Sequence, residues 1–266
     1  MDSNANLITK ERTQSFEYDL KTINYNGKEI VELTPQNVAK VEAMIRNDSK
    51  YTNAAREDNK EASPYWIIEM KKYLDDENYK GSSSFEEVVE KVVVYLDQEN
   101  KTHLNSDKVG RGEMKNRIVN CRKDLIEYLK KSNGTELIHI LSRKTDALKK
   151  ARCNPSFASK FCHFCCFYMF KNQLEQDNFS IYDSIVKKTL PFYMKYYGLK
   201  KKTQKDLCDY NTYQETIDKI IQASGGKISR NGFDHLIWYF FKGRQPPKKK
   251  RQQSKKYGDS DSVKKN

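Results

Sequence analysis

Asn154-Pro155-Ser156-Phe157-Ala158-Ser159-Lys160 is the clearest structural signal in this chain of 266 residues. Asn is a favoured N-cap and Pro a favoured first helical residue, so the segment predicts the start of a helix at Pro155. The residues that follow, as far as Phe170, are almost all apolar. A helix with almost no polar face is buried nearly all round. We therefore expect a buried helix in a mainly α-helical protein.

A second helix start follows in Phe179-Ser180-Ile181-Tyr182-Asp183. Asp183 lies 23 positions after Lys160 and precedes a helical pattern of apolar residues. An N-cap carboxylate stays ionised because the helix amides favour its charge. Asp183 is therefore an expected N-cap, whatever the function of the chain.

Lys160 and Asp183 are also candidates for chemistry. A lysine near a helix N-terminus and away from water loses part of its preference for the charged form, so its amine becomes a nucleophile. An ionised carboxylate stabilises a cation that develops beside it. On the pattern alone, Lys160 can equally extend its amine to solvent, and Asp183 can serve only as a cap.

The remaining sequence predicts further helices and one small hairpin. Residues 14–33 alternate loosely around Asn26-Gly27, which is a hairpin signal. Residues 101–112 are rich in Gly, Asn, Ser and Asp and predict a loop. Helical patterns begin at Thr34-Pro35 and cover 64–75, 84–99, 113–132 and 135–149.

We accordingly expect three parts in the chain. Residues 1–112 form an N-terminal, mostly helical subdomain with a possible short β-hairpin. Residues 113–244 form the functional domain. Residues 245–266 form a disordered basic tail, which adds phosphate contacts, acts as a nuclear localisation signal, or aids solubility.

Charge favours a polyanionic partner. The formal net charge is +13, of which residues 244–266, with nine basic and two acidic side chains, contribute +7. Residues 1–243 therefore carry +6 and are basic without the tail. A basic surface attracts nucleic acid above all, although an acidic membrane face is attracted by the same field.

Composition also limits the location. We find no run of about eighteen apolar residues and no signal peptide at the N-terminus, so we expect an intracellular monomer that does not span a membrane. Three of the six cysteines lie in Cys162-His163-Phe164-Cys165-Cys166, which is unlike a secreted disulfide framework. This cluster suggests zinc on paper, but no second metal-binding pair completes the set, so we expect neither a metal nor a cofactor.

The order of these features resembles the helix-hairpin-helix DNA glycosylases, and within them the 8-oxoguanine DNA glycosylase-like branch, to which some bacterial anti-phage glycosylases are related. The resemblance covers roughly residues 113–244. It lies in the helix start that ends in Lys160, the apolar helix, the short extended link to Asp183, and the aromatic segment from Phe233 to Gly243.

The resemblance implies a helix-hairpin-helix glycosylase-like fold and roles for individual residues. Lys160 matches the lysine that attacks the sugar C1′ of a flipped nucleotide, and Asp183 matches the catalytic aspartate. Aromatic side chains would line the pocket for the flipped base. The pocket candidates are Phe157, His163, Tyr182, Phe233, Trp238 and Phe241. The candidate DNA contacts are Lys149, Lys150, Arg152, Ser156, Ser159, Lys248, Lys249, Lys250 and Arg251.

Two functions are therefore compatible with the sequence. The first is a DNA glycosylase, with or without strand cleavage, that acts in base excision repair or anti-phage defence. Its substrate is open among 8-oxoguanine, alkylated purines and phage-modified pyrimidines. The second is a noncatalytic DNA-binding or defence module that keeps the fold. The expected location is the cytoplasm or nucleoid of a bacterium, or the nucleus of a eukaryotic cell.

Overall fold

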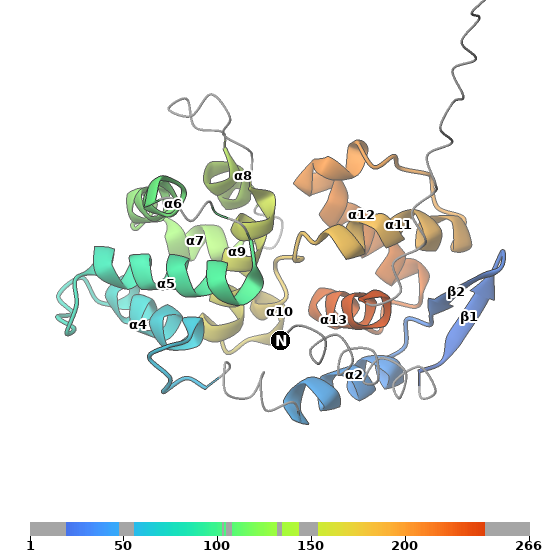
Figure 1. The fold of residues 1–266 in the computed structure, drawn as a ribbon, viewed down its shortest axis with the longest axis horizontal. Helices are drawn as coiled ribbons and strands as arrows, with labels where there is room; N and C mark the ends of the chain where they lie inside the picture. The colour runs from blue at the N-terminus through green and yellow to red at the C-terminus, as the bar shows by residue number, and fades with distance from the viewer. Residues whose placement is uncertain are drawn as a thin grey trace, which may run out of the picture.

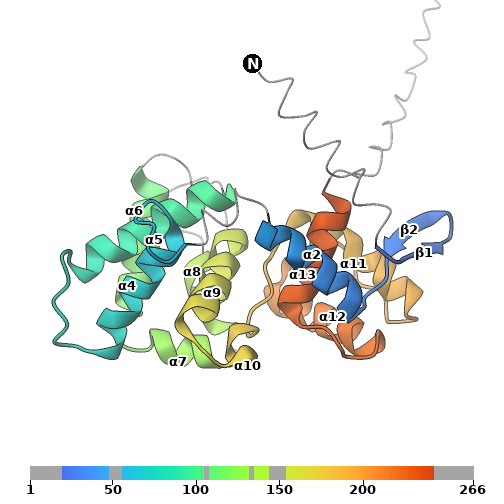
Figure 2. The same ribbon diagram turned by 90° about the horizontal axis from the view of Figure 1, so that it is seen from below.

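The computed structural model describes residues 20–47, 56–102, 104, 108–131, 135–143 and 154–242. They form a mainly helical protein with one small antiparallel sheet, as the sequence predicts. Two groups of helices stand side by side, and the chain passes between them (Figures 1 and 2). We call the group that runs from α4 (Ser63–Asp75) to α10 (Gln173–Gln176) the first body. The second body contains α2 (Pro35–Asn47) and the helices from α11 (Ser184–Tyr196) to α13 (Arg230–Phe241).

The first body is built around α9 (Pro155–Met169), which packs against helices on several sides. Asn154 accepts a hydrogen bond from the Phe157 amide at 2.9 Å, so the predicted N-cap is confirmed. Such a cap contributes about 1 kcal/mol. The other helices of the first body are α4 (Ser63–Asp75), α5 (Phe85–Asn100), α6 (Lys108–Asn120), α7 (Leu125–Lys130), α8 (Glu136–Ser142) and α10 (Gln173–Gln176).

The second body is built around α13 (Arg230–Phe241), which contacts its helices and the sheet. It joins the two ends of the described chain, because α2 (Pro35–Asn47) packs on α13 although nearly two hundred residues separate them in sequence. Figure 2 shows α2 lying across α13. The remaining elements are β1 (Thr22–Tyr25), β2 (Lys28–Val31), α11 (Ser184–Tyr196), the 3-10 turn η1 (Asp206–Cys208) and α12 (Tyr210–Ala223).

The predicted hairpin is confirmed. β1 and β2 pair antiparallel, with Thr22 opposite Val31. Asn26 and Gly27 have φ of 52° and 71°, the left-handed values that a two-residue hairpin turn requires. The buried Tyr193 hydroxyl donates to the Val31 carbonyl at 2.8 Å, which ties the sheet to α11.

Two sequence expectations about helices are corrected. The pattern over 113–132 is not one helix, because α6 ends at Asn120 and α7 begins at Leu125 after a turn. The expected loop 101–112 is partly helical, since α6 begins at Lys108 and includes two glycines. Tertiary contacts offset the low helix propensity of glycine here: α6 packs on α5, and Arg111 pairs with the buried Asp97 at 2.8 Å. The expected helix over 135–149 is shorter than predicted: α8 ends at Ser142, Arg143 has a non-helical ψ of 146°, and residues 144–149 lie outside the described part of the chain.

Most side chains of α9 are buried, as predicted, but one of them is exposed. Phe157 and Phe161 have no exposed surface, and each contributes about 1.5–3 kcal/mol by leaving water. Phe167, however, is 42% exposed, so the helix is not buried all round.

The expected domain boundary near residue 112 stays a prediction. The contacts add one fact: α2 and the sheet, which lie before it in sequence, pack with the helices after Asp183. Within the described ranges, none of the helices has the length and apolar character needed to span a membrane. The candidate DNA contacts Lys149, Lys150, Arg152 and Lys248 to Arg251 lie outside the described residues.

Candidate active site

Lys160 lies in the second turn of α9, where its side chain is largely buried. Its Nζ donates to the backbone carbonyl of Asn100 at 3.3 Å and to the Ser156 hydroxyl at 3.5 Å. Burial lowers the pKa of Lys160, while the negative charges of Asp183 and Asp234 act in the opposite direction. The amine therefore loses its proton more readily than an ordinary surface lysine, as a nucleophilic lysine requires.

Asp183 is the N-cap of α11. Its Oδ1 accepts hydrogen bonds from the amides of Ile185 at 2.6 Å and Val186 at 3.4 Å. These bonds hold the carboxylate at the point where the chain enters the second body (Figure 1). The fold thus brings Asp183 into electrostatic range of Lys160 across 23 positions of sequence.

Asp234 is a third member of this site, and the sequence analysis missed it. It lies in the second turn of α13, is only 7% exposed, and its Oδ1 has no hydrogen-bond partner among the described residues. Burial raises the pKa of Asp234 to about 8, the charge of Asp183 adds to this effect, and Lys160 opposes it. An acidic residue directly after Phe233, in a mostly apolar and aromatic segment, is the sequence signal that could have identified it. We call the three residues the Lys160–Asp183–Asp234 cluster.

Two hydrogen bonds fix the backbone that precedes Asp183. The Ser159 hydroxyl accepts from the amide of Tyr182 at 2.8 Å, and the Tyr213 hydroxyl donates to the carbonyl of Ile181 at 2.8 Å. The first bond ties this backbone to α9, beside Lys160, and the second ties it to α12. Both donors and acceptors are buried, so the position of Asp183 relative to Lys160 is set by the core.

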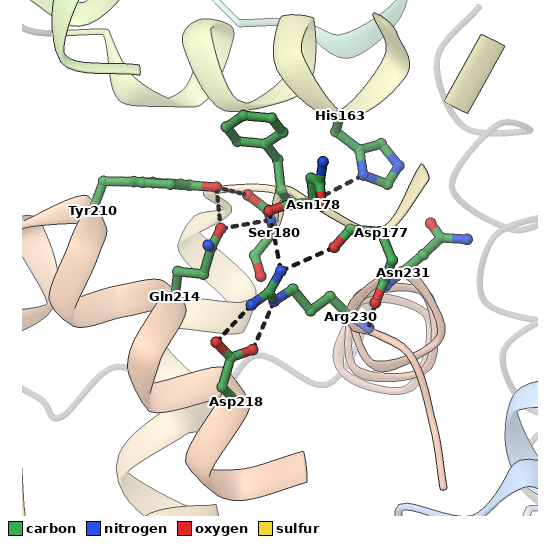
Figure 3. A network of polar contacts seen from close by, with 10 residues as sticks. His163, Asp177, Asn178, Ser180, Tyr210, Gln214, Asp218, Arg230 and Asn231 are labelled. Carbon is green, nitrogen blue, oxygen red and sulfur yellow. Dashed lines mark hydrogen bonds and ion pairs between the residues drawn. The ribbon is translucent and has the colours of Figure 1, made fainter. Parts of the chain in front are cut away.

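A second network holds the segment that crosses between the bodies, residues 177–183, which we call the crossing segment. Figure 3 shows Arg230 between Asp218 and the start of this segment. The Arg230 guanidinium donates to both carboxylate oxygens of Asp218 at 2.6 and 2.7 Å, and to the carbonyls of Asp177 and Asn178 at 3.1 Å. The Asp177 carboxylate in turn accepts from the amides of Arg230 and Asn231 at 2.8 Å. The crossing segment is thereby fixed to α12 and to the N-terminus of α13.

Replacing Arg230 by methionine is expected to destabilise the protein by about 2–4 kcal/mol, because it leaves one carboxylate and two carbonyls without their donor. Urea unfolding measures the change. Lys219→Met is the matched control, since the ion pair of Lys219 with Glu215 is exposed on both sides and is worth about 0.5 kcal/mol or less. Equal effects of the two variants would contradict a clamping role for Arg230.

The six candidate pocket residues differ in exposure. Phe157 and Phe233 have no exposed surface, so neither presents a ring face to a base in this conformation. His163 and Tyr182 are also buried. Trp238 and Phe241 are partly exposed, and the Lys242 ammonium lies 3.7 Å from the centroid of the Trp238 ring. Of the six, Trp238 and Phe241 therefore have ring surface available for stacking.

The two candidate phosphate contacts on α9 also differ. The Ser159 hydroxyl has no exposed surface and uses its hydrogen bonds within the fold, accepting from Tyr182 and donating to the carbonyl of Ser156 at 3.2 Å. It is therefore unavailable to a phosphate in this conformation. Ser156 is partly exposed and shares a hydrogen bond with Lys160.

A further set of candidate DNA contacts was not singled out from the sequence. Between Ser184 and Lys205 the chain has seven lysines and no acidic residue, a run that directly follows Asp183. We call residues 184–205 the lysine stretch. Five of its lysines are exposed: Lys188, Lys195, Lys200, Lys201 and Lys205. The charge run itself was the signal that could have identified it.

Burial lowers the pKa of His163 and of His235 to about 4. Both are therefore neutral at pH 7. His163 Nδ1 lies 3.1 Å from the Phe179 carbonyl, which can only accept, so this nitrogen carries the proton. His163 thus adds one more tie between α9 and the crossing segment.

The two histidines predict a loss of stability in acid. In the unfolded chain each histidine takes up a proton below about pH 6.5, whereas in the folded chain it stays neutral down to about pH 4. Each histidine therefore lowers the unfolding free energy by up to about 3 kcal/mol as the pH falls through this window. Asp234 acts in the opposite sense, because its raised pKa favours the folded state as the pH falls from about 8.

Urea unfolding between pH 7 and pH 4.5 checks this prediction in wild type and in the single variants His163→Gln and His235→Gln. Each variant retains Asp234, so the comparison isolates the histidine contribution. We expect a shallower decline of stability in each variant. An unchanged pH dependence in both would rule out the histidines as its cause.

No group of three or more His, Cys, Asp or Glu side chains in the described part of the chain is arranged to hold a metal ion. Cys162, Cys165 and Cys166 are instead packed in the core of the first body. Burial raises the pKa of all three thiols, so they remain protonated and apolar in character.

No protein-family model matches the chain, and no curated protein or solved structure is significantly similar to it. The function is therefore inferred from the geometry and electrostatics of the Lys160–Asp183–Asp234 cluster.

Proposed function

We propose that this protein is a DNA glycosylase that removes a damaged or modified base, with Lys160 as nucleophile and Asp183 as the catalytic carboxylate. One observation carries the proposal: a largely buried lysine with a lowered pKa lies in electrostatic range of a carboxylate held at a helix N-terminus. Asp183 caps α11, the helix that follows the passage of the chain between the two bodies (Figure 1), and its charge acts on Lys160 of α9. The strongly basic charge of the chain favours binding of DNA at such a site.

In the proposed reaction, the neutral Lys160 amine attacks C1′ of a nucleotide that has been flipped out of the duplex. The Nζ–C1′ bond forms as the bond between C1′ and the base breaks, and the bonding electron pair leaves with the base. The Asp183 carboxylate stabilises the positive charge that builds on the sugar. Transfer of a proton from Nζ to the ring oxygen then opens the sugar and leaves a Schiff base.

We further propose that α8, α9 and the residues between them form the helix-hairpin-helix that the sequence resemblance implies. In support, α8 packs directly on α9, and Lys160 lies near the N-terminal end of α9. The residues between Arg143 and Asn154, which include three of the expected phosphate contacts, are outside the described part of the chain.

The lysine stretch is the proposed main DNA-binding surface of the second body. We expect the triple variant Lys200, Lys201 and Lys205→Gln to weaken binding uniformly across sequences. If each lysine contacts one phosphate, the slope of log K against log salt becomes about 2–3 units less steep, since each contact contributes about 0.9. Fluorescence anisotropy between low and moderate salt measures this slope.

A charge-matched control separates this surface from general charge. The triple variant Lys80, Lys91 and Lys123→Gln removes the same charge from exposed positions of the first body. We expect it to change the slope by less than about one unit. Equal effects of the two triple variants would overturn the assignment of the lysine stretch.

The proposed function is tested by two assays on the wild-type protein. The first measures base release from duplex and single-stranded DNA carrying 8-oxoguanine, alkylated purines or modified pyrimidines. The second adds borohydride to the protein with abasic DNA, which traps a Schiff base as a covalent adduct. Base release together with an adduct supports the proposal. Tight, salt-sensitive DNA binding without either would instead identify a noncatalytic DNA-binding module.

A further inference from the structure

Asp234 is an unusual residue for the interior of this protein. Asp234 is only 7% exposed, and its Oδ1 makes no hydrogen bond with any described residue. A buried polar atom without a partner costs stability, so it calls for an explanation. Its neighbours in the same helix, Phe233 and Leu236, are core residues with no exposed surface, so Asp234 interrupts an apolar face.

The charges that act on Asp234 come from the other members of the cluster. Lys160 of α9 and Asp183 at the start of α11 are the two charged groups that act on it. Tyr213 faces it from α12, where burial holds the pKa of the phenol well above its usual range, so that group stays neutral. Among the described residues of α2 and β2, which also pack on α13, no charge acts on Asp234.

The two carboxyl groups of the cluster therefore differ in their surroundings. Asp183 accepts two backbone hydrogen bonds, which suit a carboxylate. Asp234 has no such donors, and burial with the adjacent negative charge raises its pKa to about 8. Its carboxyl is consequently protonated at neutral pH. Pairs of carboxyl groups in contrasting environments commonly divide the roles of acid and charged stabiliser.

We propose that Asp234 is the general acid that protonates the departing base at the Lys160–Asp183–Asp234 cluster. This inference rests on the proposed glycosylase function. The C1′ atom that Lys160 attacks is bonded to the leaving nitrogen of the base, so the proposed reaction places that nitrogen at the cluster to which Asp234 belongs. In the described part of the chain, the carboxyl groups whose charge acts on Lys160 are those of Asp183 and Asp234, and of these two Asp234 is the one without hydrogen-bond donors to its Oδ1.

The proton balance of the step is simple. As the Nζ–C1′ bond forms and the bond from C1′ to the base breaks, the leaving nitrogen gains the bonding electron pair. The Asp234 carboxylic acid gives its proton to that base, and its carboxylate remains. The carboxylate regains a proton from solvent after the products leave. An abasic substrate has no base to protonate and does not need this step.

The difference between the two substrates provides the test. We expect Asp234→Asn, which keeps the shape of the side chain but cannot donate an acidic proton, to lower single-turnover base release by about 10²–10⁴-fold. The same variant retains borohydride trapping on abasic DNA within about three-fold, since removing the carboxyl leaves the proton transfers at Lys160 in place. A structural defect in the cluster would reduce both reactions together.

The pH profile gives a second readout on wild-type protein. Base release is expected to fall as the pH rises through about 8, where Asp234 loses its proton, while trapping on abasic DNA shows no decline there. Asp209→Asn, at an exposed N-cap of α12, is the matched control and leaves both reactions unchanged.

The outcomes are separable. Loss of base release with retained trapping in Asp234→Asn supports the assignment. Equal base release in wild type and variant, or an equal loss of both reactions, would overturn it and leave the glycosylase function standing. If wild-type protein neither releases a base nor forms an adduct, the proposed function fails, and the role of Asp234 as its acid fails with it.

Discussion

Lys160→Ala is expected to form no borohydride-stable adduct with abasic DNA and to lose base release by at least about 10³-fold. The adduct requires a covalent bond from Nζ to C1′, and alanine has no amine to form it. The residual rate would come from binding and from the remaining groups of the cluster. Single-turnover assays and denaturing gels after borohydride treatment measure the two effects.

Stability distinguishes loss of chemistry from loss of the fold. Folding removes the Lys160 amine largely from water, and this loss of hydration costs free energy. Removing the amine is therefore expected to leave the melting temperature unchanged or to raise it. Lys91→Ala removes an exposed lysine of α5, which packs on α9, and serves as the control, with the adduct retained. An adduct of normal yield in Lys160→Ala would exclude this residue as the nucleophile.

Asp183→Asn is expected to reduce base release by about 10²–10³-fold while the protein stays folded. Asparagine loses the negative charge that stabilises a cationic sugar. It nevertheless caps a helix about as well as aspartate, so the unfolding free energy changes by only about 0.5 kcal/mol. Single-turnover kinetics and urea unfolding on the same preparation separate the two consequences.

The chain offers a closely matched control for this variant. Asp209 caps α12 as Asp183 caps α11, and its carboxylate accepts from the Thr212 amide at 2.8 Å. Asp209 is exposed, and its charge does not act on Lys160. We expect Asp209→Asn to match Asp183→Asn in stability and wild type in activity. A similar loss of activity in both variants would indicate that Asp183 contributes only as a cap.

Local sequence signals predicted several elements well. The start of α9 was identified because an N-cap and a proline act on their immediate neighbours, and Asn154 accepts the expected bond. The hairpin turn at Asn26-Gly27 was identified for the same reason, since its positive φ values suit those residue types. The break at residues 121–124, between α6 and α7, was not predicted, because no proline or glycine marks it.

Part of the candidate site could not be predicted from short stretches of sequence. Lys160 and Asp183 were identified from the ends of two helices, each from its own neighbourhood in sequence. Asp234 was missed because its importance depends on burial and on charges that come from α9 and α11. The exposure of the candidate pocket residues was equally inaccessible, since Phe157 and Trp238 are both aromatic yet differ in whether any ring surface meets solvent.

The amino-acid sequence was sufficient to establish a mainly helical protein, a small hairpin, a strongly basic charge and the two helix starts that carry Lys160 and Asp183. Those features depend on interactions between residues a few positions apart, which a linear pattern records. Their convergence, the clamp at Arg230 and the raised pKa of Asp234 depend instead on the three-dimensional packing. The distance between two charges and the exclusion of water from a side chain are properties of the folded structure. Both are set only when α9, α11 and α13 pack around the crossing segment.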